Sequence, residues 1–99
     1  MANFKITRNA IDIQFNLLCE LTNKATSEEQ AIKEGKTEYF QIDHTDYYGG
    51  YRIDRYEIGK TVTYGAFGFS SMQARKSTKE FYAFLCDTNT VLTYLQNNR

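Results

Sequence analysis

The sequence contains no proline and no tryptophan, and only one histidine and two cysteines. Without proline, the chain has no rigid proline-rich linker or recognition segment. Two cysteines far apart in the sequence do not form the disulfide framework of a small secreted domain. The first residues lack the apolar core of a signal peptide, and no window approaches the roughly 20 apolar residues of a membrane span. These absences predict a cytoplasmic protein that does not cross a membrane.

An excess of charge of either sign is also absent, because 12 basic residues balance 12 acidic residues. Proteins that bind nucleic acids or membranes non-specifically usually carry a basic excess, so the neutral balance argues against these partners. It also leaves self-association unopposed by strong repulsion near neutral pH. Aromatic residues are abundant by contrast: eight Tyr and seven Phe make up 15% of the chain. Tyrosine in particular suits surfaces that are partly buried and partly wet.

Helical patterns occur near both ends of the chain. Residues 9–23 place Ile11, Phe15 and Leu18 on one helical face. The alternation of apolar residues from Ile11 to Leu17 also fits a strand, but Leu17-Leu18-Cys19 breaks it and the length favours a helix. We therefore expect an N-terminal helix.

Two capping-box sequences predict further helix starts. They are Ser27-Glu28-Glu29-Gln30, with Gly35 ending a short helix, and Ser77-Thr78-Lys79-Glu80. After the second box, residues continue at helical spacing: Phe81, Leu85, Thr88, Leu92 and Leu95. Short polar side chains at 87–90 compete for the backbone, which predicts a kink or a break there.

The middle of the chain has the alternation of β-strands. Strands are predicted over 37–44, 51–58 and 61–69, with a type II′ turn at Gly59-Lys60. This turn sets a register in which Tyr56 faces Thr63. One face then carries the expected core residues, which are Tyr51, Ile53, Val62, Tyr64 and Ala66. The other, expected to be open, carries Arg52, Asp54, Tyr56, Thr61, Thr63 and Phe67.

The 99 residues suit one domain, 1–99, with the element order α-(α)-β-β-β-α. The predicted fold is α+β: a two-layer sandwich in which a three-stranded antiparallel sheet packs against the N-terminal and C-terminal helices.

No catalytic or metal-ligating motif is present. His44 lies in Asp43-His44-Thr45-Asp46, but a single histidine among carboxylates lacks the spacing of known metal sites. Ser/His/Asp or Cys/His catalysis would depend on this one residue, so an enzyme built on His44 is the third and least favoured hypothesis. Cys19 and Cys86 each lie among apolar residues, which favours core packing over reactivity, with a disulfide between them as the alternative. The sequence predicts no enzyme, no cofactor and no metal.

Two clusters are candidate binding sites. Arg75, Lys76 and Lys79 open the last predicted helix, where cations and a helix N-terminus can hold a phosphate. A solvated loop is the simpler interpretation of this basic cluster. The second cluster is a set of aromatic residues on or beside the open sheet face, with Tyr48, Tyr56, Phe67 and Phe69 as predicted partner-binding anchors. The alternatives are that helices cover both sheet faces, or that the core face and the open face are the reverse of those given above.

The order of a helix, three strands and a basic helix start resembles double-stranded RNA-binding domains. Arg75, Lys76 and Lys79 match the spacing of the basic cluster that opens the last helix in that family, over about five residues. This chain departs from the family in its neutral charge, in the bulky 81–84 segment, and in the extra segment 24–35. The resemblance implies contacts between these cations and RNA phosphates.

The leading hypothesis is therefore a small non-catalytic protein-interaction module, acting as a homodimer or an adaptor through the aromatic sheet face. The alternative hypothesis is a nucleic-acid-binding protein that uses the basic helix start together with the sheet aromatics.

Overall fold

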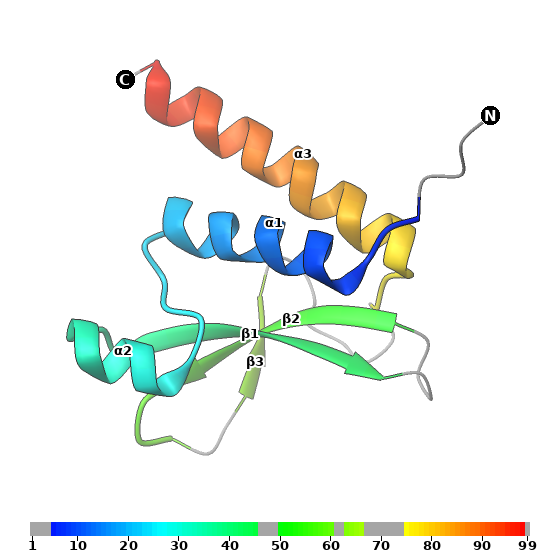
Figure 1. Cartoon of the computed structure of the whole chain (residues 1–99). Coiled ribbons are helices and arrows are strands. Elements are labelled where there is room, and N and C mark those ends of the chain that lie inside the picture. The colour runs from blue at the N-terminus through cyan, green and yellow to red at the C-terminus, as the bar shows by residue number, and fades with distance from the viewer. Residues whose placement is uncertain (1–4, 46–49, 61–62, 67–74, 99) are drawn as a thin grey trace.

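A computed structural model of the chain describes residues 5–45, 50–60, 63–66 and 75–98 (Figure 1). Its elements, in chain order, are α1 (Arg8–Leu21), α2 (Glu28–Glu34), β1 (Glu38–Thr45), β2 (Gly50–Glu57), β3 (Thr63–Gly65) and α3 (Thr78–Asn97). The α+β class that the sequence predicts is confirmed.

Each helix starts at a hydroxyl side chain. Thr7 caps α1, and Ser27 caps α2 by accepting from the Gln30 backbone amide at 3.1 Å. Ser77 and Glu80 form the complete capping box predicted at the start of α3. These side chains satisfy backbone amides that have no partner inside the helix. Local sequence therefore determines where the helices begin.

The sheet is antiparallel, and its main part is the β1–β2 pair. These strands pair over eight residues each, from Glu38 opposite Glu57 to Thr45 opposite Gly50. Over the described residues, β3 adds three pairs at the free edge of β2, including the predicted Tyr56–Thr63 pair.

The predicted three-stranded sheet is therefore corrected to a two-stranded antiparallel sheet with β3 as a short addition at its edge. Within the expected third strand, the structure assigns strand only to Thr63–Gly65, and positions 61–62 and 67–69 lie outside the described residues. Gly65 has no side chain to pack, and glycine weakens a strand interior.

The turn before β3 also differs from the prediction. The Lys60 amide donates to the Glu57 carbonyl at 3.2 Å, which places Gly59 third in a four-residue turn. Gly59 adopts a φ of +81° there. The prediction of a type II′ turn, with Gly59 as its second residue, is therefore wrong. The predicted strand register is nevertheless found at Tyr56, which pairs with Thr63.

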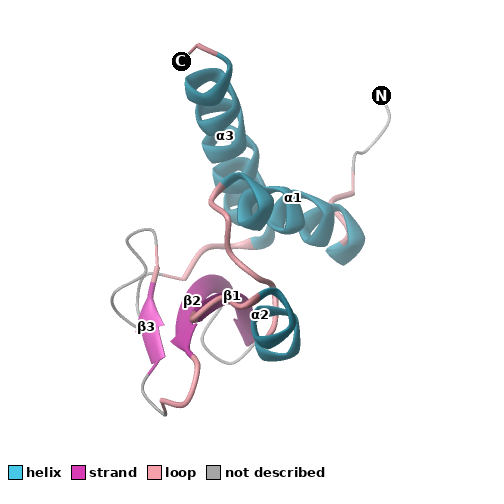
Figure 2. Ribbon diagram, turned by 90° about the vertical axis from the view of Figure 1, so that its left-hand side faces the viewer, coloured by secondary structure: helices cyan, strands magenta, loops and turns pink. Residues whose placement is uncertain are grey.

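The helices do not form one layer. α1 and α3 lie together over one face of the sheet, whereas α2 lies at the level of the sheet, beside β1 (Figures 1 and 2). α3 starts close to β2 and rises away from the sheet toward its C-terminal end (Figure 1). The second half of α3 is therefore not covered by the sheet.

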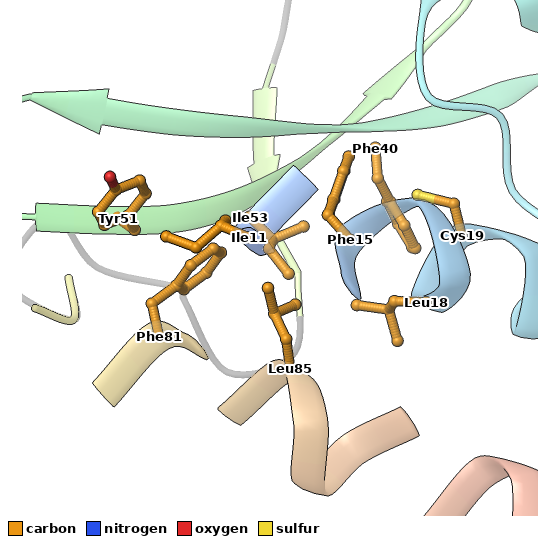
Figure 3. Packing of buried hydrophobic residues seen from close by; sticks show 9 residues of the cluster. All are labelled: Ile11, Phe15, Leu18, Cys19, Phe40, Tyr51, Ile53, Phe81 and Leu85. Carbon is orange, nitrogen blue, oxygen red and sulfur yellow. The ribbon is translucent and has the colours of Figure 1, made fainter. Parts of the chain in front are cut away.

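The main core lies between α1, α3 and the sheet (Figure 3). Its nine buried residues are Ile11, Phe15, Leu18, Cys19, Phe40, Tyr51, Ile53, Phe81 and Leu85. Burial of Tyr51 and Ile53 confirms the predicted core face of β2. Complete burial of a side chain such as Leu85 stabilises the fold by about 1.5–3 kcal/mol relative to leaving it exposed.

α1 and α3 run in the same direction, side by side. The Asn89 amide donates to the Gln14 carbonyl at 2.9 Å and to the Gln14 side chain at 3.0 Å. Seven residues further along both helices, the Gln96 amide donates to the Leu21 carbonyl at 2.9 Å. Seven residues are about two helical turns, so the two contacts lie on one side of each helix.

The predicted kink at 87–90 is wrong, because α3 is one helix through these residues. Asn89 is 3% exposed, and its amide bonds α1 instead of competing for its own backbone. The Thr90 hydroxyl donates to the Cys86 carbonyl within the helix at 2.8 Å. Both polar side chains therefore have partners that are compatible with a continuous helix.

Candidate interaction surface

The aromatic residue of the predicted partner surface that the structure describes is Tyr56. Its ring stacks on that of Tyr39, with centroids 5.1 Å apart and planes 7° apart. Tyr39 is buried with Ala25 and Ala31 in a second, smaller core, and Tyr56 is half-buried against it. Tyr56 therefore contributes to packing around α2. Tyr48, Phe67 and Phe69 lie outside the described residues.

Arg75 of the predicted basic cluster lies inside the fold. Its side chain is 5% exposed and bonds the Asp43 carboxylate at 2.7 Å and the Gly50 carbonyl at 3.2 Å. Its Nε is buried and has no hydrogen-bond partner among the described residues. The Arg75 side chain thus links the segment before α3 to the paired ends of β1 and β2.

The two lysines of this cluster are placed differently. The backbone of Lys76 exchanges two hydrogen bonds with Tyr51, and its ammonium lies 5.9 Å from the centre of the Phe84 ring. Lys79 is exposed in the first turn of α3. Arg75 therefore stabilises the fold through its bonds to Asp43 and Gly50. Of these three cations, only Lys79 is exposed.

The sheet face opposite α1 and α3 contains buried charges. Arg52 and Asp54 are 9% and 5% exposed, and their side chains pair at 2.7 Å. Burial raises the pKa of the Asp54 carboxyl, against the lowering effect of Arg52. The prediction that this face is open is wrong at both residues, which are buried and pair with each other. A buried carboxyl with a raised pKa is found in active sites, but also in structural ion-pair networks.

His44 lies on the opposite face of β1 from Asp43. Its ring stacks on Tyr51 with centroids 4.1 Å apart, and Tyr51 stacks on Phe81 of α3 at 5.1 Å. The described ranges contain no group of three or more His, Cys, Asp or Glu side chains that could hold a metal ion. His44 thus belongs to an aromatic column that joins β1, β2 and α3.

Both cysteines are free thiols. Cys19 is 1% exposed, and its burial raises the pKa of the thiol to about 12. A thiol that stays protonated is a poor nucleophile, because the thiolate is the reactive form. Core packing, the favoured interpretation of this residue, is confirmed for Cys19, whereas Cys86 is half-buried.

Cys19 also lines a polar cleft. This cleft, of about 500 Å³, lies between the end of α1 and α2, with Lys24 and Lys36 among its lining residues. Lys24 pairs with Glu38, and Lys36 lies 3.6 Å from Glu34, so both cations have acidic neighbours. The cleft therefore offers no unbalanced charge that would select an anionic ligand.

Large exposed apolar side chains are concentrated on the helices. Over the described residues they are Ile13, Leu17, Ile32, Val91, Tyr94 and Leu95. Three of them lie within five residues of α3, with exposures of 57% for Val91, 65% for Tyr94 and 56% for Leu95. Residues three and four apart are neighbours on a helix surface, so these three side chains are adjacent. We refer to Val91, Tyr94 and Leu95 as the α3 apolar surface.

In the sequence, Leu95 continues the helical spacing of Phe81, Leu85 and Leu92. Phe81 and Leu85 are buried as expected, and Leu92 is half-buried, but Leu95 is exposed because α3 has left the sheet by this point. A signal for this was present in the sequence. The eleven residues 88–98 contain no charged side chain, which is unusual for a helix exposed to water.

Searches for similar proteins assign no family. No protein-family model, curated protein or solved structure matches the chain. In addition, none of the described helices combines the length and hydrophobicity that crossing a bilayer requires.

Proposed function

We propose that the protein is a small, non-catalytic, cytoplasmic protein-interaction module that binds its partner through the α3 apolar surface. The observation that carries this proposal is the cluster of Val91, Tyr94 and Leu95, each more than half exposed on one helix. Single exposed apolar residues are ordinary on protein surfaces, whereas large contiguous apolar patches mark interaction sites.

The side chains of the α3 apolar surface contribute binding energy when a partner covers them. Complete burial of a valine or leucine side chain contributes about 1.5–3 kcal/mol. Tyrosine adds a large rigid ring with a polar tip and is enriched among the residues that dominate interface energies. Tyr94 beside Val91 and Leu95 therefore offers a partner an aromatic anchor next to two aliphatic contacts.

The test of this proposal compares two surfaces of the same protein. The double variant Val91→Ser/Leu95→Ser removes the aliphatic part of the α3 apolar surface. Ile32→Ser is the matched control, because Ile32 is 60% exposed on α2, a different helix. Each immobilised protein is incubated with an extract of cells that make the protein, and circular dichroism checks that the helices are retained.

We expect the wild type and Ile32→Ser to retain the same partner, and the double variant to lose it. Retention of the same partner by all three proteins would contradict the proposal. If retention is instead lost in Tyr56→Ala/Phe67→Ala with the fold intact, the partner surface is the aromatic sheet face. That surface stays a prediction, because three of its four anchors lie outside the described residues.

Nucleic-acid binding has less support from the described residues. Arg75 bonds Asp43 and Gly50, which leaves fewer cations for phosphate contacts than the sequence predicts. A salt-dependent gel shift that Lys79→Ala weakens would favour this alternative, because phosphate contacts release counterions.

A further inference from the structure

We propose that the partner of the α3 apolar surface is a second copy of this chain, and that two α3 helices pair antiparallel through their C-terminal halves. This inference rests on the proposed function and names its partner. Its first support is exposure: of the described residues 90–98, all are exposed except Leu92, which is half-buried. Half of a long helix thus has little cover from its own chain.

The second support is the direction in which the three side chains point. Asn89 and Gln96 mark the side of α3 that faces α1, because both bond to it. At about 100° per residue, Val91, Tyr94 and Leu95 lie about 200°, 140° and 240° around the helix from Asn89. The α3 apolar surface therefore faces away from α1, and a second helix can approach it without displacing α1.

The third support is charge. Residues 88–98 contain no charged side chain. If a partner placed charged residues at the contact, those residues would lose their hydration and find no opposite charge to pair with. A second copy brings a surface of the same uncharged kind. Its approach is also not opposed by net charge, which is zero for the whole chain. Thr90 and Asn97, which lie between the apolar residues and the side of α3 that faces α1, supply uncharged polar groups of the kind found at the rim of interfaces.

Symmetry allows a parallel or an antiparallel pair, and the helix dipoles favour the antiparallel one. Two identical surfaces that bind each other form an isologous contact around a two-fold axis. When this axis crosses the helices, they run antiparallel and their dipoles oppose each other, which is the favourable arrangement. An axis that passes between positions 91 and 95 places Val91 of one copy beside Leu95 of the other.

The size of the contact predicts its strength. A helix segment of eleven residues is about 16 Å long and about 10 Å wide. One such face falls well short of the roughly 800 Å² that each partner buries in a standard interface. We therefore expect a reversible dimer whose population rises with concentration.

The test is sedimentation equilibrium over a wide concentration range, with variants that place charges in the contact. Leu95→Glu and Val91→Lys each introduce two like charges into the symmetric pair, one from each copy. When the two variants are mixed, the introduced carboxylate of one copy lies next to the introduced ammonium of the other. Ile32→Glu is the control for a charge added elsewhere, and circular dichroism verifies the helix content of every protein.

We expect the wild-type mass to rise toward that of a dimer with concentration, and Ile32→Glu to behave in the same way. Leu95→Glu alone and Val91→Lys alone should each show at least a tenfold weaker association, and their equimolar mixture should regain the dimer. A wild-type protein that stays monomeric overturns the inference, as does a dimer that Leu95→Glu leaves unchanged. A mixture that stays monomeric overturns the antiparallel arrangement.

The two proposals fail in different ways. A monomeric wild type that still retains another protein through Val91 and Leu95 overturns the second copy as partner and leaves the proposed function standing. A monomeric wild type whose partner retention is unaffected by these residues contradicts both.

Discussion

Replacing Gly50 with alanine adds one methyl group at the point where β2 meets the segment leading into α3. A Cβ at Gly50 would lie 2.1 Å from the Lys76 carbonyl oxygen and 2.8 Å from the carbonyl carbon, both backbone atoms. Gly50 also has a φ of +147°, a conformation that residues with a Cβ rarely adopt. The Lys76 carbonyl accepts from the Tyr51 amide at 2.8 Å, and the Lys76 amide donates back to Tyr51 at 2.9 Å. The methyl group must therefore push apart two segments that are hydrogen-bonded to each other.

The cost has two parts. The backbone strain at a sparsely populated φ is of order 1–3 kcal/mol. Loss of the two hydrogen bonds between Tyr51 and Lys76 costs about 1 kcal/mol each. Gly50→Ala should therefore lower the free energy of unfolding by about 3–5 kcal/mol, a large part of the stability of a small domain.

Gly35→Ala is the matched control. Gly35 ends α2 with a φ of +72°, and a Cβ there would meet no atom within 4 Å. Its replacement costs the left-handed conformation alone, roughly 1–2 kcal/mol. The assay is urea unfolding followed by circular dichroism for the wild type and both variants. A Gly50→Ala protein that is no less stable than Gly35→Ala would refute the close contact between β2 and Lys76.

Three further perturbations test other parts of the structure. Asn89→Ala removes two hydrogen bonds to Gln14 but gains up to about 0.7 kcal/mol in helix propensity. The free energy of unfolding in urea should therefore fall by about 1 kcal/mol. An unchanged unfolding midpoint would contradict the link between α1 and α3. Because burial raises the pKa of the Cys19 thiol from 9.0 to about 12, its contribution to stability is complete below pH 9 and is lost between pH 9 and pH 12. Cys19→Ala should therefore lose less stability across this range than the wild type, and equal losses would argue against a buried thiol. Glu38→Gln should lower the free energy of unfolding by about 1 kcal/mol at pH 7, because Lys24 and then Arg55 lower the pKa of the Glu38 carboxyl. This contribution is present above pH 4.5, so the difference in stability from the wild type should shrink as the pH falls through the lowered pKa. A difference that stays constant with pH would contradict this contribution.

The parts of the fold that the sequence predicts are those that depend on neighbouring residues. Ser27 and Ser77 cap helices because the residues they bond are only three positions away. Gly35 ends α2 for the same local reason, since a left-handed residue is needed there. The pairing of Tyr56 with Thr63 follows from a short connection between two strands. Each of these features can be read from a window of a few residues.

The errors concern contacts between distant parts of the chain. Asn89 looked like a helix breaker because its partner, Gln14, lies 75 residues away. Arg52 and Asp54 were placed on an open face because charged residues usually face water, and their mutual pairing depends on the geometry of the side chains. Leu95 has the helical spacing of a core residue, but periodicity does not show where a helix rises away from its sheet.

The candidate site illustrates the same limit. In the sequence, Arg75 is part of a basic cluster that predicts a phosphate-binding site. In the structure, its side chain bonds Asp43, which lies 32 residues earlier. The α3 apolar surface could have been predicted from the sequence, because residues 88–98 contain no charged side chain. The structure adds that no other element covers this surface among the described residues.

The most direct test of the α3 apolar surface is a methyl NMR dilution series that follows Val91, Leu95 and Ile32 in the wild-type protein. If a second copy binds this surface, the methyl signals of Val91 and Leu95 shift or broaden as concentration rises, whereas those of Ile32 stay unchanged. Signals of Val91 and Leu95 that are independent of concentration, or changes of equal size at Ile32, would contradict the pairing of two α3 helices.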